Sequence, residues 1–487
     1  MALAPVNVLN FIGGRFVEPL SGLHLDNYEP ATGRVYGRVP RSAAADVEAA
    51  VAAAKQALVS WKRVKSKERA LLLFRLADLL ERDIERFAAA ESRDTGKPVS
   101  VAQKVDMARV IDNFRFYASG IIHEKSMTTH LAGQAVTWTL NQPIGVCALI
   151  SPWNLPLYLL SWKMAPALAM GNTCVCKPSE FTSVTAWMLC ELSVEAGFPP
   201  GVINMVFGLG AECGSPLTMH PEVPLVSFTG GTLTGEHIAA SVAPHHKKLS
   251  LELGGKNAGI IFDDCDFEKA VAGMVAASFS NSGQICLCCS RILVQEGIYA
   301  RFLEAFVAKT KLMVQGDPND AATQLGSLIS EAHFEKVSSY VKLAQEEGGT
   351  IECGGGRPTN LPERVQGGYF FQPTIISGLS TSCRTNTEEI FGPVVSVIPF
   401  RSEQEAIDIA NCVRFGLACS VWTESQGRAH RMALEVEAGL VWVNCWMVRD
   451  LNVPFGGWKH SGVGREGGRY ATEFYSEQKS ITMQYAD

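Results

Sequence analysis

Two residues of this sequence, Cys286 and Glu252, are of types that could carry out nucleophilic catalysis. A thiol at its ordinary pKa of about 8.5 is only a few per cent ionised at neutral pH, so a nucleophilic cysteine needs an activating environment. The turn residues Ser282 to Gln284 could open onto a short helix, whose amino terminus would stabilise a thiolate and offer N–H groups to an oxyanion. The alternative is an ordinary buried core thiol, which is the common state of free cysteine.

Glu252 lies near the end of an alternating segment, Lys248 to Leu253, that is typical of a strand with leucines on one face. Burial at the end of an apolar strand would raise the pKa of a carboxyl group toward the working pH, which suits a general base. The alternative is an ordinary polar residue on the outer face of the strand. The segment ends at Gly254 and Gly255, where the chain is expected to turn.

The elements that must position these residues alternate between apolar runs and helical periodicity. Expected strands are Gly145 to Ser151, Thr173 to Lys177, Val202 to Phe207 and Leu225 to Thr229, and expected helices are Asp46 to Trp61, Lys67 to Arg93 and Ser183 to Ala196. This repetition predicts an α/β protein with a parallel doubly wound sheet that binds ligands at the carboxyl ends of its strands.

A second α/β region is expected beyond Gly254 and Gly255, where we place a domain change. It contains a strand at Gly259 to Phe262, a helix at Phe267 to Phe279 and a strand at Ile292 to Gln295. Val136 to Asn141 and Gln478 to Gln484 read as edge strands, and exposed edges invite pairing with another subunit. We therefore expect a homodimer or homotetramer.

Length, composition and charge exclude several classes of protein. The 487 residues are enough for two or three domains, and the 47% hydrophobic and 19% charged content is typical of a globular protein. A net charge of -6 provides no cationic face, so nucleic acid is an unexpected partner. No secretory signal is visible, and the longest apolar run, Leu155 to Met170, is interrupted by Lys163 and is too short to span a membrane.

The number and spacing of the cysteines indicate a reducing compartment and do not indicate a metal site. Fourteen of them are scattered along the chain, which favours free thiols in a reducing environment such as the cytoplasm. The cluster around Cys286 has no second Cys or His cluster at zinc-site spacing, so no metal is expected.

Several ordered motifs resemble those of the aldehyde dehydrogenase superfamily. The sequence Glu252-Leu253-Gly254-Gly255-Lys256 is followed by Gly283-Gln284-Ile285-Cys286, with the cysteine 34 positions after the glutamate. Further motifs are Ser151-Pro152-Trp153-Asn154, Lys177-Pro178-Ser179-Glu180, Phe228-Thr229-Gly230, Glu389-Ile390-Phe391-Gly392-Pro393 and Pro454-Phe455-Gly456-Gly457. The resemblance extends from Phe11 to the end of the chain.

This resemblance implies a fold and an activity. The fold would be aldehyde dehydrogenase-like α/β, with a Rossmann-type NAD domain over 1–121 and 143–253, an α/β catalytic domain over 254–454, and a small β oligomerisation arm over 122–142 and 470–487. The activity would be NAD-dependent oxidation of an aldehyde to a carboxylic acid through a cysteine thiohemiacetal and thioester. Cys286 would be the nucleophile, Glu252 the base that activates water, and Asn154 an oxyanion donor.

The resemblance also implies the cofactor and the residues that bind it. The set comprises Trp153, Lys177, Glu180, Gly208, Gly230, Gly231, Thr232, Gly235, Leu253, Glu389 and Phe391. A carboxylate such as Glu180 at the adenine ribose accepts from the 2′-hydroxyl group and repels a 2′-phosphate, which favours NAD over NADP. Many members have serine at the position of Gly231, so one hydroxyl contact is expected to be absent. Lys163 is a nearby cation whose role is open between packing and proton transfer.

Two arginines, Arg115 and Arg449, bear on the substrate. In the family both segments border the substrate tunnel, where a guanidinium would bind a carboxylate through two hydrogen bonds. The pattern is most similar to the 2-aminomuconic semialdehyde dehydrogenase branch of tryptophan and kynurenine catabolism, whose substrate carries an aldehyde and a carboxylate. Salt bridges that serve only the structure are the alternative role for both arginines.

Other substrates and another class of protein remain alternatives at this stage. The aromatic residues near the expected tunnel also suit retinal or another apolar aldehyde, which would leave the arginine charges unexplained. Betaine aldehyde is disfavoured because it is a cation. A catalytically silent, crystallin-like structural protein on the same fold is the alternative outside enzymes, although such proteins usually lose part of the catalytic set.

Overall fold

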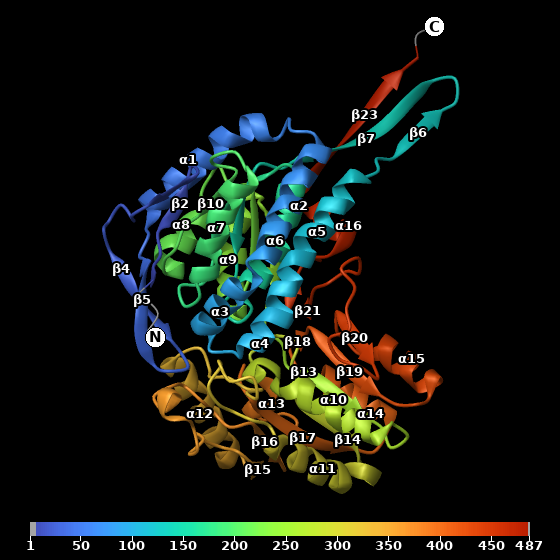
Figure 1. Cartoon of the computed structure of the whole chain (residues 1–487). Helices are drawn as coiled ribbons and strands as arrows, with labels where there is room; N and C mark the ends of the chain where they lie inside the picture. The colour runs from blue at the N-terminus through green and yellow to red at the C-terminus, as the bar shows by residue number, and fades with distance from the viewer. Residues whose placement is uncertain (1–5, 486–487) are drawn as a thin grey trace.

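The computed structural model describes residues 6–485, and the first large sheet of this structure places the expected nucleotide-binding elements (Figure 1). The sheet has eight strands in the order β22-β12-β11-β8-β9-β10-β2-β3. Their bounds are β2 Asn10–Ile12, β3 Arg15–Val17, β8 Val146–Ile150, β9 Thr173–Lys177, β10 Ile203–Met205, β11 Leu225–Thr229, β12 Lys248–Glu252 and β22 Gly462–Val463. Strands β10, β9, β8, β11 and β12 are parallel neighbours. Their chain order, 3-2-1-4-5, puts the topological switch point between β8 and β11.

The second sheet repeats this topology. Its seven strands lie in the order β15-β16-β17-β14-β13-β19-β20. The bounds are β13 Asn257–Ile261, β14 Cys289–Gln295, β15 Thr350–Cys353, β16 Thr374–Ser377, β17 Val394–Phe400, β19 Ala418–Trp422 and β20 Leu440–Val443. Strands β17, β14, β13, β19 and β20 are parallel. The chain passes from the first sheet to the second after Glu252 and returns to the first sheet at β22.

Helices cover both faces of each sheet (Figure 1). With the first sheet are α1 Ala44–Trp61, α2 Ser66–Arg82, α3 Ile84–Thr95, α4 Val99–Val101, the π-helix η1 Ala102–Met107, α5 Ala108–Ile122, α6 Pro156–Ala169, α7 Val184–Ala196, α8 Ser215–Met219, α9 Thr232–Val242 and α16 Gly468–Phe474. With the second are α10 Phe267–Phe279, α11 Tyr299–Lys311, α12 Glu331–Glu346, α13 Arg384–Thr387, α14 Glu403–Asn411 and α15 Gln426–Glu435. One apolar core joins α2, α5, α6 and α7 to the first sheet, and another joins α1 and α9 to it.

Three smaller sheets complete the chain. Strands β1 Val6–Asn7, β5 Arg34–Pro40 and β4 His24–Glu29 form one, and β18 Phe415–Gly416 pairs with β21 Trp458–Lys459. Strands β23 Ser476–Gln484, β7 Ala135–Pro143 and β6 Thr128–Leu131 form an arm that projects from the body (Figure 1). Within residues 6–485, no helix combines the length and apolarity needed to cross a membrane.

The predicted α/β class with parallel sheets is confirmed, as are most predicted strands and helices. One exception is the pattern from Lys67 to Arg93, which predicted one helix and forms two. Asp83 separates them, with backbone angles outside the helical region and a carboxylate that accepts hydrogen bonds from Arg82. Short acidic side chains bond locally and so favour helix ends over interiors. The division into domains stays a prediction, and its outermost residues, 1–5 and 486–487, lie outside the described residues.

The backbones of the two main units approach each other closely at Gly326 and Gly96. A Cβ atom built on Gly326 would lie 1.9 Å from the carbonyl oxygen of Gly96, just beyond α3. We expect Gly326→Ala to lower the free energy of unfolding by about 1–3 kcal/mol, the usual cost of overpacking, in urea titrations followed by fluorescence. Gly297→Ala is the matched control, because its Cβ would meet nothing within 4 Å. Equal stability of the two variants would contradict this account of the interface.

Candidate active site

The candidate site lies where the carboxyl ends of β8, β11 and β12 face the chain that leads into β13 and β14. Asn154 follows β8, Gly230 follows β11, and Glu252 is the last residue of β12. Cys286 precedes β14 by three residues. The switch point of the first sheet, where a doubly wound fold binds its ligands, therefore opens onto the cysteine.

A strained turn presents Cys286. Asn281, Ser282 and Gly283 have φ values of 52°, 55° and 72°, a left-handed run that costs free energy at the two non-glycine positions. A Cβ on Gly283 would lie 2.2 Å from the carbonyl oxygen of Gly392. The predicted short helix at Cys286 is wrong, because the N–H of Cys288 donates to the carbonyl of Ile285 at 2.9 Å and the chain then enters β14. No helix terminus therefore stabilises a thiolate here.

The electrostatic setting of Cys286 favours the neutral thiol. Burial raises the pKa of the thiol, and the neighbouring carboxylates of Glu252 and Glu389 raise it further. The guanidinium of Arg449 acts in the opposite direction. A nucleophilic thiolate at this position therefore needs a proton acceptor in the site.

Glu252 is a buried carboxyl group without hydrogen-bond partners. Only 4% of the residue is exposed, and neither carboxyl oxygen has a partner within residues 6–485. Burial raises its pKa well above the ordinary value, and the nearby carboxylate of Glu466 raises it further. A Cβ on Gly456 would lie 2.9 Å from Glu252 Oε1, so a glycine makes room for this side chain. The sequence-based expectation of a raised pKa is confirmed.

Lys163 belongs to a buried network beside Glu252. Its ammonium group donates to Glu466 Oε1 at 2.9 Å and to Ser227 Oγ at 3.0 Å. The charge of Lys163 opposes the rise in the pKa of Glu252. Lys163 therefore does more than fill space. It forms an ion pair with Glu466, the carboxylate that raises the pKa of Glu252.

Asn154 connects the first sheet to the cysteine turn. Its side-chain Nδ2 donates to the carbonyl of Gln284 at 2.9 Å, and its own carbonyl accepts from Asn281 Nδ2 at 3.2 Å. An amide nitrogen carries two hydrogens, so a second one remains for a ligand next to Cys286. The residue is buried, with 4% exposed.

The segment after β11 has the features of a phosphate-binding helix start. Gly231 precedes α9, and a Cβ there would meet nothing within 4 Å. Gly230 and Gly235 are instead tightly packed, since a Cβ on either would lie 2.4 Å from Phe228 and Leu253 respectively. The buried hydroxyl of Thr232 has no partner within residues 6–485. An open helix amino terminus with a free hydroxyl group fits a pyrophosphate.

Trp153, Glu389 and Phe391 form the opposite wall. The rings of Trp153 and Phe391 meet edge to face with centroids 5.4 Å apart. Glu389 Oε1 accepts from the N–H of Gly255 at 2.9 Å, and a Cβ on Gly254 would clash with this carboxylate. Glu389, Phe391 and Cys286 line one pocket. The structure thus brings this wall to the cysteine.

Lys177, Glu180 and Gly208 lie at the ends of β9 and β10. Lys177 Nζ is 3.6 Å from Glu180 Oε2 and donates to the carbonyl of Pro178 at 3.1 Å. A Cβ on Gly208 would lie 2.9 Å from the carbonyl of Ser42. The carboxylate of Glu180 remains partly exposed, as a ribose contact requires.

The structure separates the two predicted arginines. Arg115 pairs on the surface with Asp78 and Glu81 of α2, with nitrogen to oxygen distances of 2.8 and 2.7 Å. Its predicted substrate role is not supported, because two carboxylates already satisfy its guanidinium. Arg449 instead lies 4.0 Å from the ring centroid of Phe455 and 4.9 Å from that of Trp162, and its charge acts on both Glu252 and Cys286.

Sequence analysis missed a second cation near Arg449. The guanidinium carbon of Arg109 is 6.0 Å from the ring centroid of Tyr158, and Arg449 Nη1 is 3.3 Å from the hydroxyl of the same tyrosine. Within residues 6–485 neither guanidinium is in an ion pair, and Arg449 Nε is buried without a partner. Two arginines that share a tyrosine and lack carboxylates are suited to an anionic ligand.

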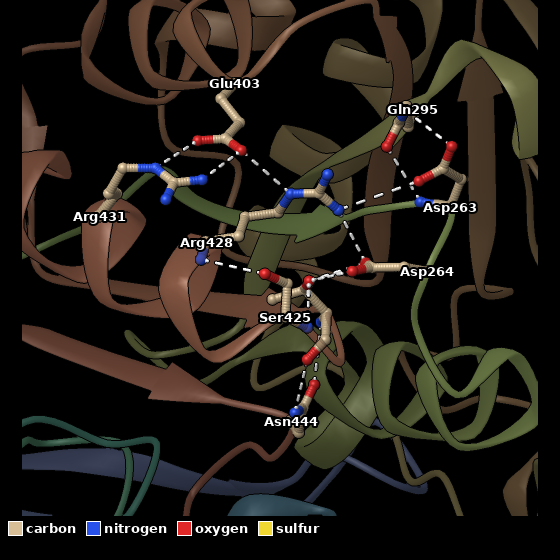
Figure 2. Close-up of polar contacts among 9 residues, drawn as sticks. Asp263, Asp264, Gln295, Glu403, Ser425, Arg428, Arg431 and Asn444 are labelled. Atoms are coloured by element: carbon tan, nitrogen blue, oxygen red, sulfur yellow. Dashed lines mark hydrogen bonds and ion pairs between the residues drawn. The ribbon is translucent and has the colours of Figure 1, made fainter.

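The loop that carries Arg449 is anchored at its start (Figure 2). Asn444 accepts from the N–H of Thr423 at 3.0 Å and donates to its carbonyl at 2.9 Å. Thr423 in turn donates to Asp264, which pairs with Arg428 at 2.9 Å. These groups fill the carboxyl ends of β13 and β19 with a connected set of polar contacts. Further along the loop, Trp446 Nε1 donates to the carbonyl of Leu287 at 3.0 Å.

Comparison with known proteins agrees with this geometry. The model of the aldehyde dehydrogenase family matches residues 16–481. The chain belongs to the aldehyde dehydrogenase family. Among curated relatives, the family member named 2-aminomuconic semialdehyde dehydrogenase of Homo sapiens is 52% identical over 480 residues, covering 98% of each chain. The 2-hydroxymuconic semialdehyde dehydrogenase of Pseudomonas sp. (strain CF600) is 44% identical and covers 98% of this chain and 99% of its own.

Solved structures of the family match the whole fold. A putative aldehyde dehydrogenase from Burkholderia cenocepacia is 40% identical, with a TM-score of 0.96 over 98% of this chain and 97% of its own. The NAD⁺ complex of an aldehyde dehydrogenase from Bacillus cereus is 38% identical, with a TM-score of 0.96 over 99% of this chain and 97% of its own. The predicted family is confirmed.

The unpaired burial of Glu252 predicts a gain in stability when its charge is removed. Because the folded-state pKa is raised above the ordinary value of 4.5, folding favours the protonated form, and stability is lost as the pH rises from the unfolded pKa through the folded one. We expect Glu252→Gln to be more stable than the wild type at pH 8 and similar at pH 4 in urea unfolding. Glu268→Gln, on the exposed side of α10, should show no such difference, and a loss of stability at pH 8 in Glu252→Gln would contradict the assignment.

Proposed function

We propose that this protein oxidises a semialdehyde that carries a carboxylate, 2-aminomuconic semialdehyde above all, to the corresponding acid with NAD. The single observation that carries the proposal is the arrangement of an unpaired Arg449 beside Cys286 and Glu252. The printed names of the relatives at 52% and 44% identity support the same class of substrate. Retinal, betaine aldehyde and a silent structural role are less well supported, because they leave the arginine or the complete catalytic set without a purpose.

Cys286 attacks the aldehyde carbon while its thiol proton passes to the carboxylate of Glu252, whose charge acts on that thiol. Because burial and the nearby carboxylates raise the pKa of the thiol, its proton leaves as the sulfur bonds to the aldehyde carbon. The negative charge that develops on the aldehyde oxygen is stabilised by the free amide hydrogen of Asn154 and by the N–H of Cys286. Removing one such donor typically slows a reaction by about 10²–10³ fold.

Hydrolysis of the resulting thioester needs an activated water molecule. Glu252 has a raised pKa and two unpaired oxygens, so its carboxylate is a strong base once it is ionised. Lys163 compensates the charge of Glu466 beside it. Because the charge of Glu466 is compensated in this way, Glu252 can lose and regain a proton beside it at a lower electrostatic cost.

The residues around α9 and the opposite wall fit NAD. Gly231 and Thr232 leave an open helix start for the pyrophosphate, and Glu180 and Glu389 offer carboxylates to the two ribose groups. Lys177 would contact the adenine ribose, and Trp153 with Phe391 would confine the nicotinamide. The cofactor, when bound, accepts the hydride of the aldehyde.

Arg449 and Arg109 would hold the substrate carboxylate. The hydroxyl of Tyr158 and the rings of Trp162 and Phe455 lie against the Arg449 guanidinium and reduce its contact with water, which strengthens a charged hydrogen bond. A guanidinium gains two parallel hydrogen bonds from a carboxylate. The acid end of the substrate would then fix the distance of its aldehyde end from Cys286.

We also propose a cytoplasmic homodimer or homotetramer. All 14 cysteines are free, which suits a reducing compartment. The projecting arm of β6, β7 and β23 leaves β6 and β23 as strand edges, and such edges are usually covered by another chain.

Variants of the two catalytic groups should separate the two halves of the reaction. We expect Cys286→Ala to form no NADH but to bind NAD as the wild type does in fluorescence titration. Glu252→Gln should retain a slowed burst of NADH and lose at least 10² fold in steady-state turnover, because the thioester forms but is not hydrolysed. Full turnover in Glu252→Gln would contradict its role as the base.

The substrate assignment predicts a selective effect of Arg449. We expect Arg449→Met to lower kcat/KM for 2-aminomuconic or 2-hydroxymuconic semialdehyde by at least tenfold, the usual loss for a charged hydrogen bond, and to change it little for propanal. Arg115→Met is the matched control, because its guanidinium is bound to α2. Equal losses for charged and uncharged aldehydes in Arg449→Met would overturn the carboxylate site.

A further inference from the structure

A buried charged cluster, Glu91, Lys97 and Asp106, lies against the backbone of the Asn154 turn and has no part in the steps above. At most 2% of any of the three residues is exposed. Glu91 lies on α3, Lys97 follows that helix, and Asp106 lies on the π-helix η1. Three segments of the first unit therefore meet at one turn of the active site.

The cluster holds both ends of that turn. Lys97 Nζ pairs with the carboxylate of Asp106 and donates to the carbonyl of Asn154 at 2.9 Å. Glu91 Oε1 accepts from the N–H of Leu157 at 3.3 Å, while its other oxygen accepts from the hydroxyl of Thr185 at 2.6 Å. A cation thus fixes the carbonyl at Asn154, and a carboxyl group fixes the amide three residues later.

The cost of this cluster indicates a purpose other than stability. Buried ion pairs contribute little or negative stability relative to apolar residues of the same size. Asp106 Oδ1 has no partner within residues 6–485, and burial raises the pKa of both carboxyl groups, that of Glu91 to about 7. A π-helical segment is also unfavourable and occurs mostly at functional sites.

The turn is where orientation matters for catalysis. The carbonyl of Asn154 accepts from Lys97 and from Asn281 of the cysteine turn, and the side chain of Asn154 donates to Gln284 of that same turn. These contacts fix the peptide group of Asn154 and one hydrogen of its side-chain amide. The second hydrogen of that amide can then point in only one direction. Displacement of a catalytic group by about 1 Å can cost about 10² fold in rate.

We propose that Lys97, held by Asp106, is a positioning residue that fixes the carbonyl of Asn154 and thereby aims its amide at the oxygen of the aldehyde. The inference rests on the proposed role of Asn154 as an oxyanion donor. A residue that acts in this way affects the formation of the thiohemiacetal and not the binding of NAD.

A double-mutant cycle tests this inference in the full-length protein. The variants are Lys97→Met with Asp106→Leu, which removes both charges at similar volume, Asn154→Ala, and all three substitutions together. We measure the NADH burst with saturating NAD and 2-hydroxymuconic semialdehyde, the KM of the aldehyde, and NAD binding by fluorescence. We expect the pair variant to slow the burst by about tenfold or more with KM and NAD binding unchanged, and Asn154→Ala to slow it by about 10²–10³ fold.

The combined protein decides between positioning and plain stability. If Lys97 acts through Asn154, the combined protein is no slower than Asn154→Ala, because the group that Lys97 positions is already gone. A pair variant with the wild-type burst, or slowdowns that multiply in the combined protein, would overturn the inference. An unchanged burst in Asn154→Ala would overturn the proposed oxyanion role itself, and the inference with it.

Two further variants protect the test against a folding defect. Asp106→Asn keeps the shape of the side chain and loosens Lys97, so it should slow the burst in the same direction by a smaller factor, and a wild-type burst there would count against the inference. Asp94→Asn removes another fully buried carboxylate from α3 that accepts from Asn27 and Val184 and does not touch the Asn154 turn. Its burst should equal that of the wild type, and a slowdown equal to that of Asp106→Asn would assign the effect to general loosening of α3.

Discussion

The contact between the Asn154 turn and the cysteine turn is the interaction on which the site depends. It joins the carboxyl end of a strand in one sheet to the segment that enters a strand of the other. Two amide side chains make it, with Asn154 donating to the backbone of Gln284 and Asn281 donating to the backbone of Asn154. Both acceptors are main-chain carbonyls of the two turns. The two hydrogen bonds therefore tie the backbone of one turn to the backbone of the other and fix the spacing of the two sheets at this point. A shift of one sheet against the other would move the thiol and its oxyanion donor apart.

The rest of the site consists of ionisable side chains that have little contact with water, and charging them there costs free energy. Loss of contact with water raises the pKa values of Glu252, Cys286 and Glu389. The two carboxylates raise the pKa of the Cys286 thiol further. Lys163 and Arg449 are two of the cations that lower the pKa of Glu252, and Lys163 pairs with Glu466 while Arg449 lies against aromatic rings. A protein selected for stability alone would pair or remove these groups, so their arrangement reflects chemistry.

The sequence predicted the framework well and the surface of the site less well. Alternation and apolar runs located β9 and β11 to the residue because buried parallel strands leave few ways to arrange an apolar segment. The turn at Cys286 was mistaken for a helix start, since its left-handed residues Asn281 and Ser282 are held by tertiary contacts that local sequence does not show.

The arginines show a second limit of sequence reasoning. Arg109 and Arg115 lie six positions apart on α5, which places them about 120° apart around the helix. Helical spacing alone does not say which face meets the site, and the π-helix η1 just before α5 shifts the register of everything that follows. The partners that decide the matter, Asp78 and Glu81 for Arg115 and Tyr158 for Arg109, come from other helices. Arg449 was predicted to lie near the site because it stands shortly before the motif Pro454-Phe455-Gly456-Gly457.

The raised pKa of the Cys286 thiol has a consequence for the lifetime of the protein. Peroxides and electrophiles attack thiolates far faster than thiols, and burial with two nearby carboxylates favours the thiol form of Cys286. The neighbouring Cys288 and Cys289 are buried with raised pKa values as well. The desolvation that raises the pKa of this thiol therefore lowers its rate of oxidation as well as its nucleophilicity.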